Sequence, residues 1–293
     1  MKVGIPRSMY YYYFKDLWLN FFDYLNVEVI ISPKTNKEIM DLGLKYSIDE
    51  MCLSMKNYIG HVAYLKDKCD CVLVPRIDNY GRDNQTCTNF LASYDIINNM
   101  FDIDIVNYNI NLLNDEDEIK GFISIGNLLG FDKKKAVDAY EYAKVKSFKT
   151  KKEKILKNLK NLKSKRKKIL LVGHPYNIYD ELIGMPIIEM IKKLDVEIIY
   201  SDLFNEIDES KKYSDGVYWK YSRENLSSIS KSINMVDGIV FLSSFPCGLD
   251  SLVNELVMRK INKPYINIII DDNSVSGGIE TRIESFIDIV SCL

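Results

Sequence analysis

The chain has 293 residues, of which 47 % are hydrophobic and 27 % charged, and its net charge is −2. These values are typical of a folded protein of about two domains, and the slightly acidic balance argues against attraction of the whole protein to nucleic acid. No apolar run reaches the roughly 20 residues that span a bilayer. The N-terminus lacks the apolar stretch of a signal peptide, so we expect a cytoplasmic protein without structural disulfides.

Short apolar runs alternate with helical patterns along the first half of the chain. The runs predict strands at residues 2–6, 27–32, 69–75 and 103–108. A helix rich in Trp, Leu and Phe is expected between the first two strands, and a second helix at 89–100. This alternation favours parallel strands in an open α/β sheet.

The second half repeats the pattern. Strands are predicted at 168–173, 197–201, 238–242 and 265–271, and helices at 186–194, 223–235, 250–261 and 279–290. We therefore predict an α/β protein of two tandem, open, mainly parallel-sheet Rossmann-like domains, residues 1–148 and 168–293, with a ligand cleft between them.

A basic segment, 149–167, separates the two predicted domains. Residues 149–168 include eleven Lys or Arg. Ile155, Leu159 and Leu162 follow the spacing i, i+4, i+7, which favours an amphipathic linker helix with a solvated basic face. A docking surface for an acidic partner protein is the alternative.

Six cysteines are present, and their spacing matches no local zinc or ferredoxin pattern. Cys52, Cys87 and Cys247 each come just before a helical segment. The positive N-terminal end of a helix stabilises a thiolate or an anionic cluster. Cys69 and Cys71 alternate in a predicted strand and are interpreted as core residues, and Cys292 is expected to have no role.

Three kinds of chemistry fit the helix-end thiols. A nucleophilic cysteine needs a base, and the chain offers only His61 and His174, but this reading leaves two of the thiols unexplained. Zinc held by three Cys and one His is allowed by count, whereas an iron–sulfur cluster better tolerates ligands that lie far apart in sequence. The phosphate-binding motifs GxxxxGK[ST] and GxGxxG do not occur, so no bound nucleotide is predicted.

Several motifs, in this order, resemble one known family. They are KVGIPR, CLSMKNYIGHV and VLVPRI, then a loop ending in Cys87, and later FPCGLDSLVNEL and IIIDDNSVSGGIETRIESFID. Together they resemble the activase-related proteins of the 2-hydroxyacyl-CoA dehydratase and benzoyl-CoA reductase superfamily, which includes the double-cubane cluster proteins. The resemblance covers nearly the whole chain and is weakest across the basic segment.

The resemblance implies a cluster, most simply [4Fe–4S], held by Cys52, Cys87 and Cys247. It further implies an oxygen-sensitive iron–sulfur redox protein, either a reductase or a dehydratase component. Such a protein would receive low-potential electrons from a separate ATP-dependent iron–sulfur activator, for reduction or radical dehydration of a small substrate. A non-catalytic cluster carrier or accessory protein is the alternative. A second subunit or a homodimer is expected, with no nucleic-acid or membrane partner.

Other residues are expected around the cluster. Gly277 and Gly278 precede the last helix, where backbone amides could cradle an anion. The remaining candidates for tuning the cluster are His61, Arg76, Ser244 and Arg282. Asp250 and Ser251 flank Cys247 and could also tune the cluster, but both are good helix-capping types, and capping is the favoured interpretation.

Overall fold

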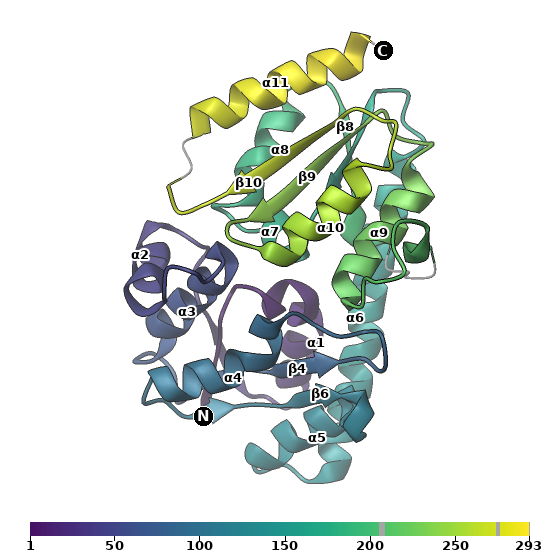
Figure 1. The fold of residues 1–293 in the computed structure, drawn as a ribbon. Coiled ribbons are helices and arrows are strands. Elements are labelled where there is room, and N and C mark those ends of the chain that lie inside the picture. Colours follow the sequence, from purple (N-terminus) through teal and green to yellow (C-terminus); the bar gives the residue numbers. More distant parts are fainter. Residues whose placement is uncertain (205–208, 274–275, 293) are drawn as a thin grey trace. The chain divides into compact units, whose positions relative to one another are not determined.

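A computed structural model describes residues 1–204, 209–273 and 276–292 of the chain. The chain divides into two compact units, Met1–Lys151 (unit 1) and Lys152–Leu293 (unit 2). Both units are α/β with parallel sheets (Figure 1), which confirms the predicted class and strand direction. The Rossmann-like tandem arrangement stays a prediction. None of the described helices is both long and apolar enough to cross a membrane.

Unit 1 is built on a four-stranded parallel sheet of order β2-β1-β3-β5. Its strands are β1 (Lys2–Ile5), β2 (Glu28–Ile31), β3 (Cys71–Leu73) and β5 (Ile105–Val106). A two-stranded parallel sheet, β4 (Arg76–Asn79) with β6 (Asn109–Asn111), follows β3 and β5 along the chain. Pro75, which has no N–H to donate, separates β3 from β4. The predicted strand at 69–75 is therefore shorter than expected.

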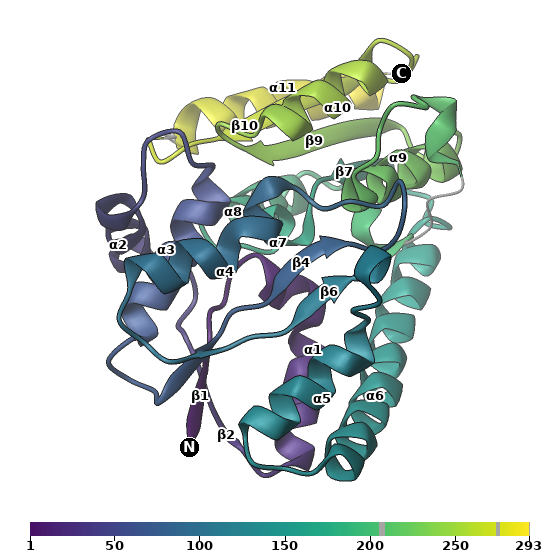
Figure 2. The ribbon, with the colours of Figure 1, turned by 60° about the horizontal axis from the view of Figure 1, so that its bottom comes forward.

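Helices cover the sheet of unit 1. They are α1 (Tyr10–Tyr24), α2 (Lys37–Tyr46), α3 (Leu53–Leu65), α4 (Thr88–Met100), α5 (Glu118–Leu128) and α6 (Lys133–Asn161), with a short helix η1 (Leu112–Asn114). Figure 2 shows α1, α5 and α6 side by side, and their aromatic rings explain why. Phe122 of α5 lies 4.8 Å from Phe21 of α1 and 5.2 Å from Tyr140 of α6, centroid to centroid. The tyrosine run at the start of α1 also contributes to the core, since Tyr10 and Tyr11 are buried.

The basic segment predicted as a linker helix, 149–167, belongs only in part to α6, whose C-terminal end is formed by residues 149–161. This helix begins at Lys133, well before residue 149. Its first half buries Ala136, Ala139 and Ala143. Small buried residues at helical spacing continue directly into the lysine-rich part, and no glycine or proline interrupts the helix between them.

Unit 2 has a four-stranded parallel sheet of order β10-β9-β7-β8. Its strands are β7 (Lys168–Val172), β8 (Glu197–Tyr200), β9 (Gly238–Ser244) and β10 (Tyr265–Ile270). Its helices are α7 (Pro175–Ile178), α8 (Gly184–Lys192), α9 (Lys220–Ser232), α10 (Gly248–Met258) and α11 (Ser276–Cys292), with short helices η2 (Ser201–Leu203) and η3 (Ser210–Lys212). In Figure 1, α8 and α11 lie on one face of this sheet, and α9 and α10 on the other.

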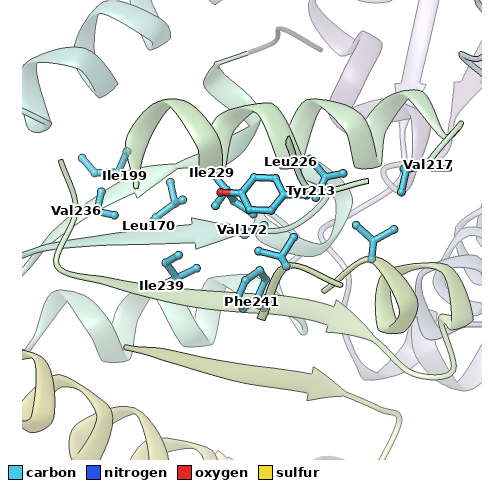
Figure 3. Close-up of a cluster of buried hydrophobic side chains, with 12 residues drawn as sticks. Leu170, Val172, Ile199, Tyr213, Val217, Leu226, Ile229, Val236, Ile239 and Phe241 are labelled. Carbon is cyan, nitrogen blue, oxygen red and sulfur yellow. The ribbon is translucent and has the colours of Figure 1, made fainter. Parts of the chain in front are cut away.

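The core of unit 2 lies between α9 and the central strands. Figure 3 shows Leu226 and Ile229 of α9 facing Leu170 and Val172 of β7 and Phe241 of β9. All five side chains are at most 2 % exposed. Burial of side chains of this kind contributes about 1.5–3 kcal/mol each before conformational entropy is counted. This packing holds β7 and β9 side by side at the centre of the sheet.

The order of strands defines one special edge in each sheet. In unit 2 the chain moves outward from β7 to β8 on one side, and from β9 to β10 on the other. The carboxyl ends of β7 and β9 are therefore the point where the direction of winding reverses, and such points collect ligands in open α/β sheets. The carboxyl ends of β1 and β3 occupy the same position in unit 1.

Candidate functional site

The two predicted ligand thiols of unit 1 each precede a helix. Cys52 has extended backbone and caps α3, and Cys87 does the same for α4. Their carbonyl oxygens accept the first helical hydrogen bonds, from Lys56 N and Leu91 N respectively. Both cysteines are partly exposed. Each thiol therefore lies at the positive N-terminal end of a helix, which stabilises negative charge.

Asn89 links the two helix starts. Its Nδ2 donates to Cys52 Sγ at 3.4 Å, and Asn89 lies in the first turn of α4, two residues after Cys87. The sulfur of Cys52 is therefore held against the turn that begins with the second thiol. Sequence reasoning missed Asn89, because an asparagine in a first helical turn is an ordinary residue with no pattern of its own.

His61 has a structural role in unit 1. Its Nδ1 lies 2.8 Å from Ser32 Oγ and its Nε2 lies 3.1 Å from Thr35 Oγ1, so both ring nitrogens have partners at the end of β2. Burial, and to a lesser degree the charge of Arg7, lowers the pKa of His61 to about 3. A neutral imidazole with both nitrogens bonded has no position left for a ligand. The hydrogen bonds described for His61 are therefore to hydroxyl groups of Ser32 and Thr35.

Arg76 also has partners of its own. Its guanidinium lies 2.5 Å from Asp95 and over the ring of Tyr94, both on α4. It therefore ties β4 to α4. The remaining thiols of unit 1 fit the core interpretation in part: Cys71 is buried in β3, and burial raises its pKa to about 11. Cys69 is only partly buried, lies before the strand and donates to Leu65 O at 3.3 Å.

In unit 2, Cys247 caps α10 at the carboxyl end of β9. Its Sγ accepts the backbone N–H of Asp250 at 3.4 Å, and its carbonyl accepts from Ser251 Oγ at 2.8 Å. Ser244, the last residue of β9, is buried, and its carbonyl accepts the N–H of Cys247 at 3.0 Å. The sulfur itself therefore performs the capping that sequence analysis assigned to Asp250 and Ser251.

Asp250 instead pairs with His174. His174 Nε2 and Asp250 Oδ1 are 2.9 Å apart, and the two side chains are 7 % and 9 % exposed. The ring of Tyr176 stacks on His174 at 5.0 Å. His174 follows β7 and lies at the start of α7. Asp250 lies in the first turn of α10, the helix that follows β9. The pair therefore occupies the point where the winding of the unit 2 sheet reverses.

The pKa of His174 reflects two opposed effects. Burial alone lowers the pKa of His174, but the charge and hydrogen bond of Asp250, helped by Glu224, raise it above its usual value. Asp250 therefore favours the protonated form of His174, against the effect of burial. The arrangement can hold a proton beside the helix turn that Cys247 begins.

The glycine and arginine candidates of unit 2 lie in α11. Gly277 and Gly278 belong to its first turn, although a loop before the helix was expected. The Arg282 guanidinium donates to Asn267 O of β10 at 2.8 Å. Arg282 therefore joins α11 to the edge strand.

No complete metal site is visible in either unit. Among residues 1–204, 209–273 and 276–292, no group of three or more His, Cys, Asp or Glu side chains is arranged to hold a metal ion. Two of the predicted cluster ligands belong to unit 1 and the third to unit 2. Neither unit by itself contains all three predicted ligands, so the cluster on Cys52, Cys87 and Cys247 stays a prediction.

Comparison with known proteins decides the family. Residues 2–204 match the family described as "CoA enzyme activase uncharacterised domain (DUF2229)". The chain belongs to this family. No curated protein matches the chain.

Likenesses to solved structures are weak. The chain is similar to the binding protein FpvC from Pseudomonas aeruginosa in complex with Mn²⁺, at 11 % identity and a TM-score of 0.28, over 99 % of this chain and 97 % of that one. It is also similar to UDP-GlcNAc 2-epimerase from Methanocaldococcus jannaschii, at 15 % identity and a TM-score of 0.23, over 99 % and 92 %. A sugar transporter from Clostridium phytofermentans has 10 % identity and a TM-score of 0.21, over 99 % and 92 %. These scores carry no argument about function.

The family membership corrects the functional prediction. An electron-receiving iron–sulfur component, with a separate ATP-dependent activator as its partner, was expected from the motifs. This expectation is wrong, and with it the alternative of a non-catalytic cluster carrier, because the matching family is described as an activase domain. Helix-end thiols suit either side of such a system, so the thiol pattern could not distinguish the activating protein from its target.

Proposed function

We propose that this chain works on the activase side of a CoA-linked enzyme system, and that its direct partner is a 2-hydroxyacyl-CoA dehydratase-like component. The family match carries the proposal, because it spans residues 2–204 and so includes almost all of unit 1 and the β7–β8 part of unit 2. The motif resemblance to the same superfamily supports it independently.

Features of both units suit this role. Cys52 and Cys87 are partly exposed at two helix starts that Asn89 joins, so a partner or reagent can reach them. In unit 2, the buried His174–Asp250 pair lies at the edge of the sheet where open α/β proteins place their ligands. We propose that these two positions, rather than the buried thiol of Cys71, take part in activation.

The direct test is an activation assay without oxygen. The dehydratase-like component is mixed with its 2-hydroxyacyl-CoA substrate, ATP and dithionite, with and without this chain. We expect dehydrated product only when the chain is present. Phosphate release by each protein alone shows which of them hydrolyses ATP. A component that is active with its own activase, and inactive with this chain at every concentration, would contradict the proposal.

Single serine substitutions at the helix-end thiols test the site. We expect Cys52→Ser, Cys87→Ser and Cys247→Ser each to lower the activation rate by at least about tenfold, the usual cost of disturbing a tuned site. Cys292→Ser is the matched control, because this thiol is exposed at the end of α11. If all four variants activate equally well, the thiols have no part in the function.

The cluster prediction has its own measurement, and no step above depends on it. It requires that protein purified without oxygen contains iron and acid-labile sulfide in equal amounts, about four of each per chain. It further requires that Cys52→Ser, Cys87→Ser or Cys247→Ser removes the iron, while Cys69→Ser retains it. Iron-free protein that still activates the component would end the cluster prediction and leave the proposed function intact.

A further inference from the structure

Helix α6 has a second apolar face, whose side chains remain largely exposed in the part of the chain that the structure describes. Val145, Phe148, Leu156 and Leu159 are 69 %, 69 %, 55 % and 42 % exposed. At 3.6 residues per turn they fall within an arc of about 80° on the helix. We call these four residues the α6 stripe.

The opposite side of α6 is the one that holds the helix in place. Ala136, Ala139 and Ala143 are fully buried there. Asn158, on the same side, exchanges two hydrogen bonds of 3.0 Å with the backbone of Tyr200 in β8. Single exposed apolar residues are common, but four on one face of an anchored helix form a patch of the kind that marks an interaction site.

Charge around the α6 stripe narrows the choice of partner. Helix α6 contains eleven lysines and three acidic residues, so it carries +8, and the rest of the chain carries −10 to reach the total of −2. Lys152 lies within the arc of the stripe and Lys149 beside it, and both are exposed. A strongly basic helix on an otherwise acidic protein is complementary to an acidic surface.

We propose that the α6 stripe and its lysines dock an acidic amphipathic helix of a partner protein. The apolar residues of such a helix would cover Phe148 and its neighbours, and its carboxylates would pair with Lys149 and Lys152. A lipid surface fits less well, because Lys152 would be submerged among the apolar residues that insert. This inference does not depend on the proposed function.

The test uses the full chain and a synthetic helical peptide, with leucine at every third or fourth position and glutamate elsewhere. A peptide of the same composition in scrambled order is the reference ligand. We expect the ordered peptide to bind at least about tenfold more tightly, as an apolar anchor requires. Equal binding of the two peptides would overturn the proposal.

Two variants separate the apolar from the charged contribution. Val145→Ser with Phe148→Ser should weaken binding by at least about tenfold and leave its salt dependence unchanged. Lys149→Glu with Lys152→Glu should weaken binding and also flatten its salt dependence, because screened charges steer association. The matched control is Lys37→Glu with Lys192→Glu, which makes the same charge change at two exposed sites elsewhere. Equal loss in this control would show a net-charge effect and overturn the proposal.

Other occupants are outcomes of the same experiment. If vesicles of anionic phospholipid bind the wild-type chain but not the Val145→Ser, Phe148→Ser variant, the stripe is a lipid-binding surface. A dimer in sedimentation analysis that this variant dissociates would make a second copy the occupant. Either result overturns the proposed partner. Circular dichroism of each variant confirms that the helix is retained.

Discussion

Replacing Gly60 by alanine should lower the free energy of unfolding by about 3 kcal/mol, the upper part of the usual range for overpacking. Helices α2 and α3 approach so closely that their backbones touch. A Cβ at Gly60 would collide with the carbonyl oxygen of Ile39, and a Cβ at Gly43 with that of Lys56. A backbone carbonyl cannot rotate away as a side chain can, so the two helices must separate. Urea unfolding followed by circular dichroism measures the loss.

The matched control for this substitution is Gly278→Ala. Gly278 lies in the first turn of α11, and a Cβ there would meet nothing within 4 Å. The same chemical change should therefore stabilise the protein slightly, by at most about 1 kcal/mol, through helix propensity. If both variants unfold at the same urea concentration as the wild type, the close approach of α2 and α3 is disproved. Because Cys52 begins α3, Gly60→Ala should also disturb the Asn89 contact with its sulfur.

The second large effect is a loss of stability in acid that His61 controls. The pKa of His61 is about 3 in the folded protein, against 6.5 for an ordinary histidine. Between these values the unfolded chain binds a proton that the folded chain excludes. The contribution of His61 to the free energy of unfolding is therefore fully present above pH 6.5. It falls as the pH drops towards 3, by about 1.4 kcal/mol for each pH unit.

Urea unfolding at several pH values between 4 and 7.5 measures this slope. His61→Gln removes the titrating group, so the variant should be less stable at pH 7 but lose less stability between pH 6 and pH 4. His174 acts with the opposite sign: its pKa is raised, so its contribution is present below the ordinary value and is lost as the pH rises through the folded value. A wild-type slope identical to that of His61→Gln would show that His61 is accessible to protons.

Much of the fold could be predicted from local patterns. The apolar run at 168–173 and its neighbours predicted β7 to β10 to within a few residues, because strand and helix periodicities are properties of adjacent residues. The three helix-end thiols were located in the same way, since each precedes a helical pattern. Two boundaries differed from the prediction. Pro75 has no N–H to donate and separates β3 from β4, and a row of buried alanines makes α6 begin well before residue 149.

The contacts that build the candidate site were beyond local patterns. Asn89 reaches Cys52 across 37 positions of sequence, and His174 reaches Asp250 across 76. Asp250 could be a helix cap or an ion-pair partner, and its sequence neighbours favour the cap. Asp250 forms the ion pair because β7 pairs with β9, which brings the carboxyl ends of the two strands together. The family match then showed that the chain belongs to a family described as a CoA enzyme activase domain.

The sequence by itself determined that this is an α/β protein of parallel strands, with thiols at three helix starts. These features depend on residue periodicity and on the order of elements, and both are written along the chain. Only the tertiary structure decided that burial lowers the pKa of His61, whereas Asp250 raises the pKa of His174. The two histidines are alike in sequence, and what separates them is burial beside hydroxyls in one case and beside a carboxylate in the other.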